Sequence, residues 1–183
     1  AMCHVPEQGF TQNELATPVG DEGRGGRRNA PSLYNLAFQR SLFWDGREQS
    51  LEAQVWSPLL ARNEMANPSK EAVLKRLNAI PTYQAAFAEN YGQGLTSQTL
   101  GLALAAYQRA LISGNSAFDR WYFAPTQNAH SSAQFGAEAT RGFAVFQKQG
   151  SHSCHTLTKE NALFTDGNFY NTGTGLLREQ RGI

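Results

Sequence analysis

The 183-residue sequence is poor in the residues from which small proteins build covalent or metal-bound cores, because it contains two cysteines and two methionines. Two cysteines exclude a disulfide-dense scaffold. A structural zinc site takes four ligands at short spacing, and neither cysteine has a second ligand pair nearby. The alternation of apolar and polar residues that marks strands is nearly absent, and so is any run of about eighteen apolar residues. The sequence therefore predicts an all-α protein without a membrane span.

An excess of charge of one sign is also lacking, since 16 basic residues stand against 15 acidic ones. This balance argues against proteins that wrap nucleic acid or bind anionic membranes, both of which use a basic surplus. No signal peptide is recognisable, and the chain begins in the middle of the first motif discussed below. We therefore expect a piece of a longer protein, and the missing export signal does not indicate a compartment.

Both cysteines are followed directly by histidine, as Cys3-His4 and Cys154-His155. This pair is the right half of the covalent haem motif Cys-x-x-Cys-His, in which the thiols become thioethers and the histidine binds iron. The left half is missing from both copies: the chain begins one residue after the first expected cysteine, and Ser151 stands at the second. The pairs predict two haem sites, while two inert thiols or a Cys3–Cys154 disulfide remain alternatives at this point. The other histidines, at positions 130 and 152, are expected to be solvated.

Apolar spacing predicts several helices separated by long loops. The glycine-rich segment 5–32 is expected to be a loop, and it lacks the lysine and the following helix of a phosphate-binding loop. One predicted helix begins near Ser50 and is kinked or ended at Pro58, a second begins after Ser69 as its N-cap, and a third begins at Pro81. Two more are predicted over 97–112, with Gly114 as the C-terminal cap, and over 136–149. The polar segment 115–135 breaks the pattern and is the expected domain boundary.

Short motifs follow one another along essentially the whole chain. They include Pro6–Thr11 (PEQGFT), Arg28–Pro31 (RNAP), Leu42–Arg47 (LFWDGR), Asn63–Ala66 (NEMA) and Ser116–Arg120 (SAFDR). In this order the motifs resemble the bacterial dihaem cytochrome c peroxidase family, which includes MauG. The resemblance implies two c-type cytochrome domains with a haem in each and at their interface. Residues 1–115 would form the peroxidatic domain and residues 116–183 the start of a truncated electron-transfer domain.

The resemblance also implies roles for individual residues. Two haem c groups would be attached at Cys3 and Cys154, with His4 and His155 as the proximal iron ligands.

Five further residues are assigned by the same resemblance. Gln54, Pro58 and Glu64 would line the distal side of the first haem, with Glu64 as the acid/base partner for peroxide. Trp44 would relay electrons between the haems, and Asn29 matches an asparagine that helps to hold a calcium ion. Without the resemblance, Trp44 would be a packing aromatic, Glu64 a surface charge and Asn29 a turn residue.

One position departs from the family pattern. Typical members carry a histidine after a Thr-x-x-Gly stretch, and it blocks the peroxidatic iron in the resting oxidised state. Aligning 17–20 with that stretch places Asp21 there, and the sequence has no histidine between His4 and His130. We therefore predict a first haem that is open to peroxide without prior reduction, as in the MauG-like branch.

The implied reaction is the reduction of hydrogen peroxide at the first haem, with electrons that enter at the second. A small redox protein would donate them, or, in a MauG-like variant, a protein side chain would be the substrate. An alternative is a dihaem electron-transfer cytochrome without peroxide chemistry, and another is a haem-free helical interaction domain. Because covalent haem is assembled outside the cytoplasm, the haem interpretation predicts a periplasmic protein.

Overall fold

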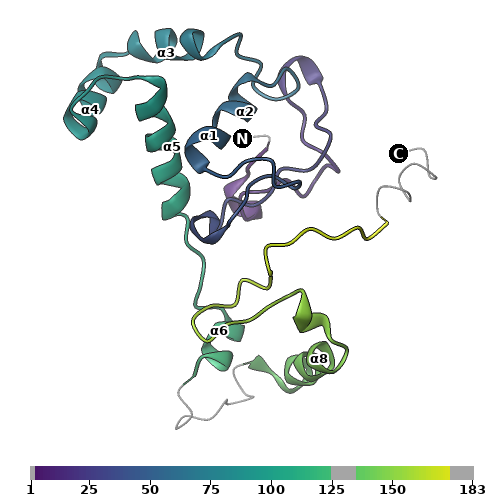
Figure 1. Cartoon of the computed structure of the whole chain (residues 1–183). Coiled ribbons are helices and arrows are strands. Elements are labelled where there is room, and N and C mark those ends of the chain that lie inside the picture. The colour runs from purple at the N-terminus through teal and green to yellow at the C-terminus, as the bar shows by residue number, and fades with distance from the viewer. Residues whose placement is uncertain (1–2, 125–134, 174–183) are drawn as a thin grey trace. The chain divides into compact units, whose positions relative to one another are not determined.

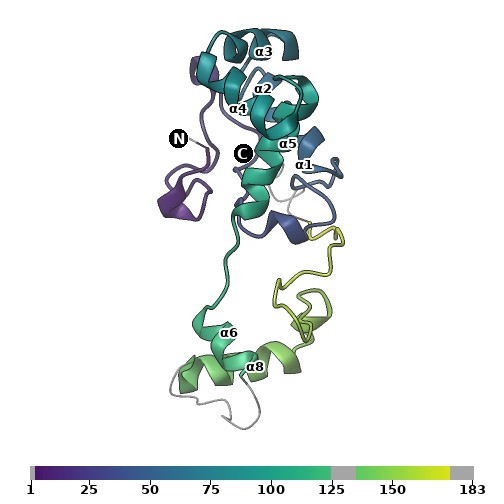
Figure 2. The ribbon, with the colours of Figure 1, turned by 90° about the vertical axis from the view of Figure 1, so that its left-hand side faces the viewer.

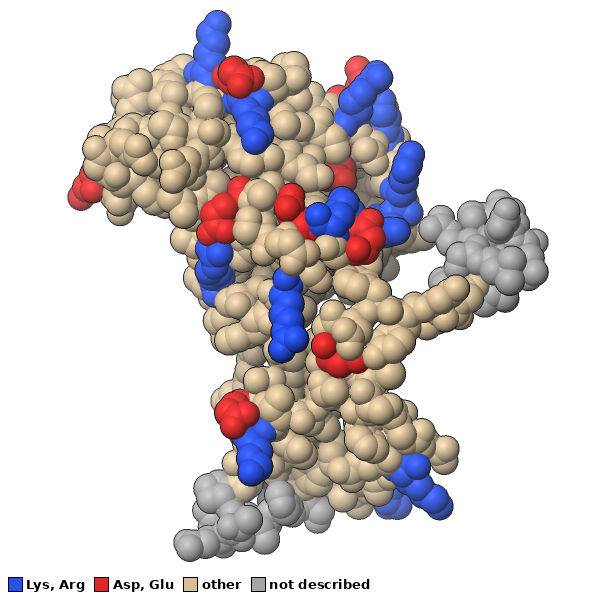
Figure 3. Space-filling model, viewed as in Figure 1, with Lys and Arg blue, Asp and Glu red and all other residues tan. Residues whose placement is uncertain are grey.

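The computed structural model describes residues 3–124 and 135–173. Within these ranges the chain forms α-helices, short 3-10 helices and three isolated β-bridges, and no strand. The prediction of an all-α protein is confirmed for this part of the chain. It contains no helix that is both long and apolar enough to cross a bilayer. On the face shown in Figure 3, acidic and basic side chains are interspersed, as the balanced composition predicts.

The chain divides into two compact units, Ala1–Ser113 and Gly114–Ile183 (Figure 1). That each unit corresponds to one haem domain, with the predicted limits 1–115 and 116–183, stays a prediction. The first unit contains η1 (Pro6–Gln8), η2 (Asp21–Gly23), η3 (Leu36–Phe38), α1 (Leu51–Gln54), α2 (Trp56–Leu60), α3 (Lys70–Asn78), α4 (Pro81–Tyr91) and α5 (Ser97–Ala110). Its main core consists of Val55, Trp56, Val73, Phe87, Leu95 and Leu100.

The helix starts follow from local sequence. The Ser69 hydroxyl accepts a hydrogen bond from the amide of Ala72 at 3.2 Å and caps α3, as predicted. Pro81 opens α4, where its missing N–H costs nothing. The helix that begins after Ser50 is interrupted, as predicted, but at Val55, where it divides into α1 and α2, and Pro58 lies inside α2. Proline at position 58 offers no N–H to the carbonyl four residues earlier and crowds it.

The end of α5 differs from the prediction. The helix ends at Ala110 with Leu111 as its cap residue, so Gly114 is not the cap. The Leu111 carbonyl instead accepts a hydrogen bond from the amide of Asn35 at 2.9 Å, and the Asn35 side chain bonds to the backbone of Ser113. A loop 78 residues away in sequence therefore sets this helix end.

Helix α5 packs closely against α1, and Figures 1 and 2 show the two helices side by side. Gly101 makes this approach possible, since a Cβ atom there would lie 2.9 Å from the carbonyl oxygen of Glu52. About two turns further on, Arg109 donates to the Glu52 carboxylate at 2.6 Å. The hydrogen bond from Arg109 outweighs partial burial and lowers the pKa of Glu52. The contact holds the segment that carries Gln54 and Pro58.

The second unit contains α6 (Ala117–Tyr122), α8 (Ala137–Lys148) and η5 (Ser151–Ser153). Helix α8 confirms the prediction for 136–149, and Gly150 follows it in the left-handed region. Helix α6 was missed, because the sequence analysis took 115–135 as an irregular boundary. Its start was readable, since Ser116 and Asp119 form a reciprocal capping box. The aromatic rings of this unit gather in one cluster: Phe118, Trp121, Tyr122, Phe135, Phe143, Phe146 and Phe164.

Candidate functional site

A cavity of about 1250 Å³ opens in the first unit. It exceeds the roughly 300–1,000 Å³ of ordinary small-molecule pockets, and leucines and Phe43 form much of its apolar wall. All the residues that the sequence analysis singled out in this unit as site residues line it: Cys3, His4, Asn29, Trp44, Gln54, Pro58 and Glu64. Positions up to 61 residues apart in the sequence thus face one space.

One ring nitrogen of His4 makes a hydrogen bond to the backbone, and the other is available to bind a metal. Its Nδ1 lies 2.9 Å from the carbonyl oxygen of Phe10. Because a carbonyl can only accept, Nδ1 is the donor, and in the neutral ring Nε2 is then the nitrogen that carries the lone pair. Phe10 adopts a positive φ of 57°, which closes the short loop from Val5 to Thr11 and turns this carbonyl inward. A second bond that fixes the ring in this way is typical of histidines that bind metals.

Cys3 lies beside His4 on the cavity wall and is a free, partly buried thiol. Burial raises its pKa, and the negative charge of Glu64 raises it further. The carboxylate of Glu64 is therefore close enough to act on the cysteine, although the two residues are far apart in sequence.

The predicted distal residues come from one continuous segment. Gln54 ends α1 and Pro58 lies in α2, four residues later, and both line the cavity. Glu64 follows in a turn whose backbone bonds are local: its amide donates to Ala61 at 2.9 Å, and Met65 donates to Pro58 at 3.1 Å. Gln54, Pro58 and Glu64 are all half-buried, which leaves their functional atoms access to the cavity.

Trp44 is 58% exposed, yet its ring is fixed by a hydrogen bond. The indole N–H donates to the carbonyl oxygen of Asn29 at 2.7 Å. The Asn29 side chain is engaged as well, since it donates to the carbonyl of Gln12 at 2.6 Å and accepts from the amide of Ala30 at 2.8 Å. In the described part of the chain, no three His, Cys, Asp or Glu residues are grouped to hold a metal. The calcium role of Asn29 stays a prediction.

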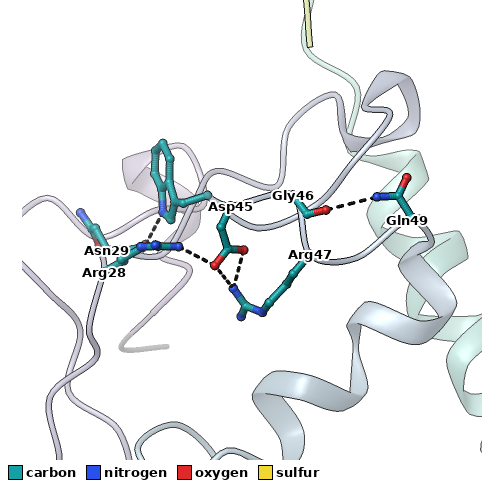
Figure 4. A network of polar contacts seen from close by, with 7 residues as sticks. Arg28, Asn29, Asp45, Gly46, Arg47 and Gln49 are labelled. Carbon is teal, nitrogen blue, oxygen red and sulfur yellow. Dashed lines mark hydrogen bonds and ion pairs between the residues drawn. The ribbon is translucent and has the colours of Figure 1, made fainter. Parts of the chain in front are cut away.

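An ion-pair network beside Trp44 has no counterpart in the sequence predictions (Figure 4). Asp45 accepts hydrogen bonds from Arg28 and Arg47, both at 2.8 Å, and the Arg47 guanidinium lies 3.5 Å from the centre of the Phe43 ring. Desolvation acts to raise the pKa of Asp45, but the bonds from Arg47 and Arg28 outweigh it and lower that pKa. All three charged residues line the cavity and leave a net positive charge there.

The second Cys-His pair repeats the local geometry of the first. Cys154 and His155 follow η5, and Nδ1 of His155 lies 3.1 Å from the carbonyl oxygen of Phe164. Phe164, like Phe10, has a positive φ and is followed by threonine. The recurring Phe-Thr pair after each Cys-His was a signal that the sequence analysis did not use. A smaller cavity in this unit, about 320 Å³, does not include either residue.

The two remaining histidines are His130 and His152. His152 is exposed, as predicted. His130 lies outside the described residues.

The donor sets fit haem c. Each site offers one thiol for a thioether and one imidazole whose Nε2 is available to iron. The first site adds an apolar space large enough for a macrocycle and arginines that match the charge of haem carboxylates.

Comparison with known proteins agrees with this chemistry. Residues 1–127 match the family model described as di-haem cytochrome c peroxidase. The chain is 37% identical over 176 residues to the methylamine utilization protein MauG of Methylorubrum extorquens, covering 94% of this chain and 46% of that protein. It is 31% identical over 155 residues to the cytochrome c peroxidase Ccp of Escherichia coli, covering 85% of this chain and 32% of that protein.

A solved structure shows the same fold. The diheme peroxidase BthA from Burkholderia thailandensis superimposes with a TM-score of 0.76 at 28% sequence identity, over 91% of this chain and 47% of that one. The chain thus spans half or less of the length of these relatives. The family match, the relatives and the two Cys-His sites agree that this chain belongs to the dihaem cytochrome c peroxidase family.

Proposed function

We propose that this chain carries the peroxide site of a dihaem c-type peroxidase, an oxidoreductase that reduces hydrogen peroxide. The observation that carries the proposal is the single cavity on which Cys3 and His4 meet Gln54, Pro58 and Glu64. A carrier of electrons needs the first two residues, but it has no use for a carboxyl group and an amide at the same cavity. The cavity therefore favours a peroxidase over the alternative of a dihaem electron-transfer cytochrome.

Cys3 and His4 would hold the first haem c, and Cys154 and His155 the second. When bound, haem supplies a redox-active iron with a coordination position open to peroxide. His4 would hold the iron through its Nε2, since its Nδ1 is bonded to the carbonyl of Phe10. The apolar wall of the cavity would keep water away from the bound group.

Glu64 would move the proton that peroxide cleavage requires. Reduction of one peroxide to two waters takes up two electrons and two protons, and breaking the O–O bond is easier once a proton has moved from the near to the far oxygen. A carboxyl group can take that proton and return it. The amide nitrogen of Gln54 can donate to a peroxide oxygen and fix its orientation, while Pro58 offers no competing N–H.

Trp44 would pass electrons toward the first site. Its indole is oriented by Asn29, and it borders the cavity beside the arginines that pair with Asp45. Asn29 would also contribute to a calcium ion through oxygen atoms, the ligands that this ion prefers. The electrons would come from the second haem and, before that, from a small redox protein.

A MauG-like variant, in which a protein side chain is oxidised, is the second candidate function. The observation in its favour is Asp21, at the position of the blocking histidine. Asp21 does not line the cavity: its side chain is exposed and lies 3.8 Å from Arg24. His4 is the one histidine among the described residues that does line it. Either function would place the full protein in the periplasm.

The proposal is tested by measuring peroxide consumption with the haem-loaded full-length protein and a reduced small cytochrome as donor. We expect turnover that depends on both peroxide and donor, and a pyridine haemochrome assay that gives two covalent haems. Reversible donor oxidation by other acceptors, with no peroxide consumption in any redox state, would instead identify an electron carrier.

A further inference from the structure

The loop formed by Gly20, Asp21, Glu22, Gly23 and Arg24 (the 20–24 loop) lies against the backbone of the segment that carries Glu64. Three contacts join them. A Cβ atom at Gly20 would lie 2.3 Å from the carbonyl oxygen of Asn63 and 2.7 Å from that of Glu64. The Asp21 amide donates to the Glu64 carbonyl at 2.8 Å. Arg24 donates to the Arg62 carbonyl at 3.1 Å.

The loop is itself stiffened by internal bonds. The amide of Gly20 donates to the carbonyl of Arg24 at 2.8 Å, and the amide of Arg24 donates to the carbonyl of Asp21 at 3.1 Å. The Arg24 guanidinium also pairs with the carboxylates of Asp21 and Glu22. A closed loop of this kind offers a fixed surface to whatever it contacts.

The segment it contacts has little other support. Residues 61–66 form an irregular turn between α2 and α3, and their other backbone bonds are local ones to Ser57, Pro58 and Ala61. The bonds from the 20–24 loop reach it from about 40 residues away in sequence. They reach the carbonyls of Arg62 and Glu64, and Gly20 lies against the carbonyl of Asn63 between them.

We propose that the 20–24 loop is a positioning element for Glu64, and that Gly20 and the backbone amide of Asp21 are its key groups. This inference rests on the proposed function, since it gives Glu64 its task. Glycine is needed at position 20 for space and not for its backbone conformation, because its φ of −97° is open to any residue. Neither group would touch peroxide; both act through the placement of the Glu64 carboxyl.

Two pairs of variants of the haem-loaded protein test this. Gly20→Ala forces the loop off Asn63, whereas the matched Gly94→Ala adds a methyl group where nothing lies within 4 Å. Asp21→Pro deletes the N–H that bonds to Glu64, at the first position of η2, where proline is tolerated, whereas Asp21→Ala keeps it.

We expect Gly20→Ala and Asp21→Pro to lower the second-order rate constant for peroxide about 10- to 100-fold, as a displacement of about 1 Å can do. Haem content and the spectrum of the resting protein should be unchanged, and Gly94→Ala should behave as the parent. Asp21→Ala should lose much less than Asp21→Pro, because it removes only the 3.8 Å ion pair with Arg24 and keeps the N–H that bonds to Glu64. In a Glu64→Gln background, Gly20→Ala should have no further effect, because both changes remove the same function.

The outcomes separate the two proposals. If the parent protein does not react with peroxide, the proposed function itself fails. If the parent reacts and both test variants match their controls, the 20–24 loop has no positioning role. A loss that is undiminished in the Glu64→Gln background would also contradict it, since that loss would come from general damage to the fold. If Gly20→Ala loses haem, the comparison of Asp21→Pro with Asp21→Ala decides whether the 20–24 loop positions Glu64.

Discussion

The indole N–H of Trp44 donates to the backbone carbonyl of Asn29 at 2.7 Å, although more than half of the Trp44 side chain is exposed. An exposed tryptophan without such a bond would sample several rotamers. The bond therefore gives this ring one orientation at the edge of the cavity, which a relay of electrons requires.

Trp44→Phe should slow electron transfer between the haems at least tenfold and leave peroxide binding unchanged. Phenylalanine keeps an aromatic ring but loses the N–H bond to Asn29 and is harder to oxidise. Stopped-flow spectroscopy of the half-reduced protein measures the transfer step directly. An unchanged transfer rate would remove Trp44 from the electron path.

Glu64→Gln should lower peroxide turnover by about two to four orders of magnitude, the usual contribution of general acid–base catalysis. Glutamine has nearly the same shape, so haem content should stay the same. Glu89→Gln, an exposed change on α4, is the matched control and should have no effect. Turnover that stays near the parent value would exclude Glu64 from the proton transfer.

Gly101→Ala should destabilise the protein by about 1–3 kcal/mol, because the new methyl group would meet the Glu52 carbonyl at 2.9 Å. Helix propensity alone predicts instead that replacing glycine by alanine within a helix stabilises the protein. Gly142→Ala in α8, where nothing lies within 4 Å, should therefore stabilise by about 0.5–1 kcal/mol. Denaturation of both variants with urea measures the difference. Equal effects at the two glycines would argue against the close approach of α1 and α5.

The Glu52–Arg109 pair should make a small contribution to stability that depends on pH. Arg109 lowers the pKa of Glu52 in the folded state. The contribution is then complete above the unfolded pKa of about 4.3 and is lost as the pH falls through the lowered folded value. Glu52→Gln should cost about 0.2–1 kcal/mol at pH 7, and the difference from the parent should vanish in acid. A cost that is independent of pH would show that the charge is not its source.

The sequence predicted those features of the fold that depend on neighbouring residues. Ser69 and Pro81 start their helices as expected, because capping and the missing N–H of proline act within one turn. The predicted end of α5 was wrong, because the observed end depends on a hydrogen bond from the distant residue Asn35. Helix α6 was not predicted, although its capping box can be read from the sequence.

In the site, too, features carried by short motifs were predicted and contacts between distant loops were not. Seven residues that line the cavity of the first unit were predicted as site residues, from the Cys-His pair and from the family resemblance of short motifs. The pairing of Asp45 with Arg28 and the contact of Gly20 with Asn63 were not predicted. Both join loops far apart in sequence, and a single sequence carries no periodic or local signal for such contacts.

We propose above all that the cavity around His4 is a peroxide site that is open in the resting oxidised protein. The most direct test is the optical spectrum of the oxidised, haem-loaded full-length protein before and after one equivalent of hydrogen peroxide. We expect a high-spin band from the first haem that shifts at once on addition of peroxide, without prior reduction. A low-spin first haem whose spectrum peroxide leaves unchanged would contradict this account.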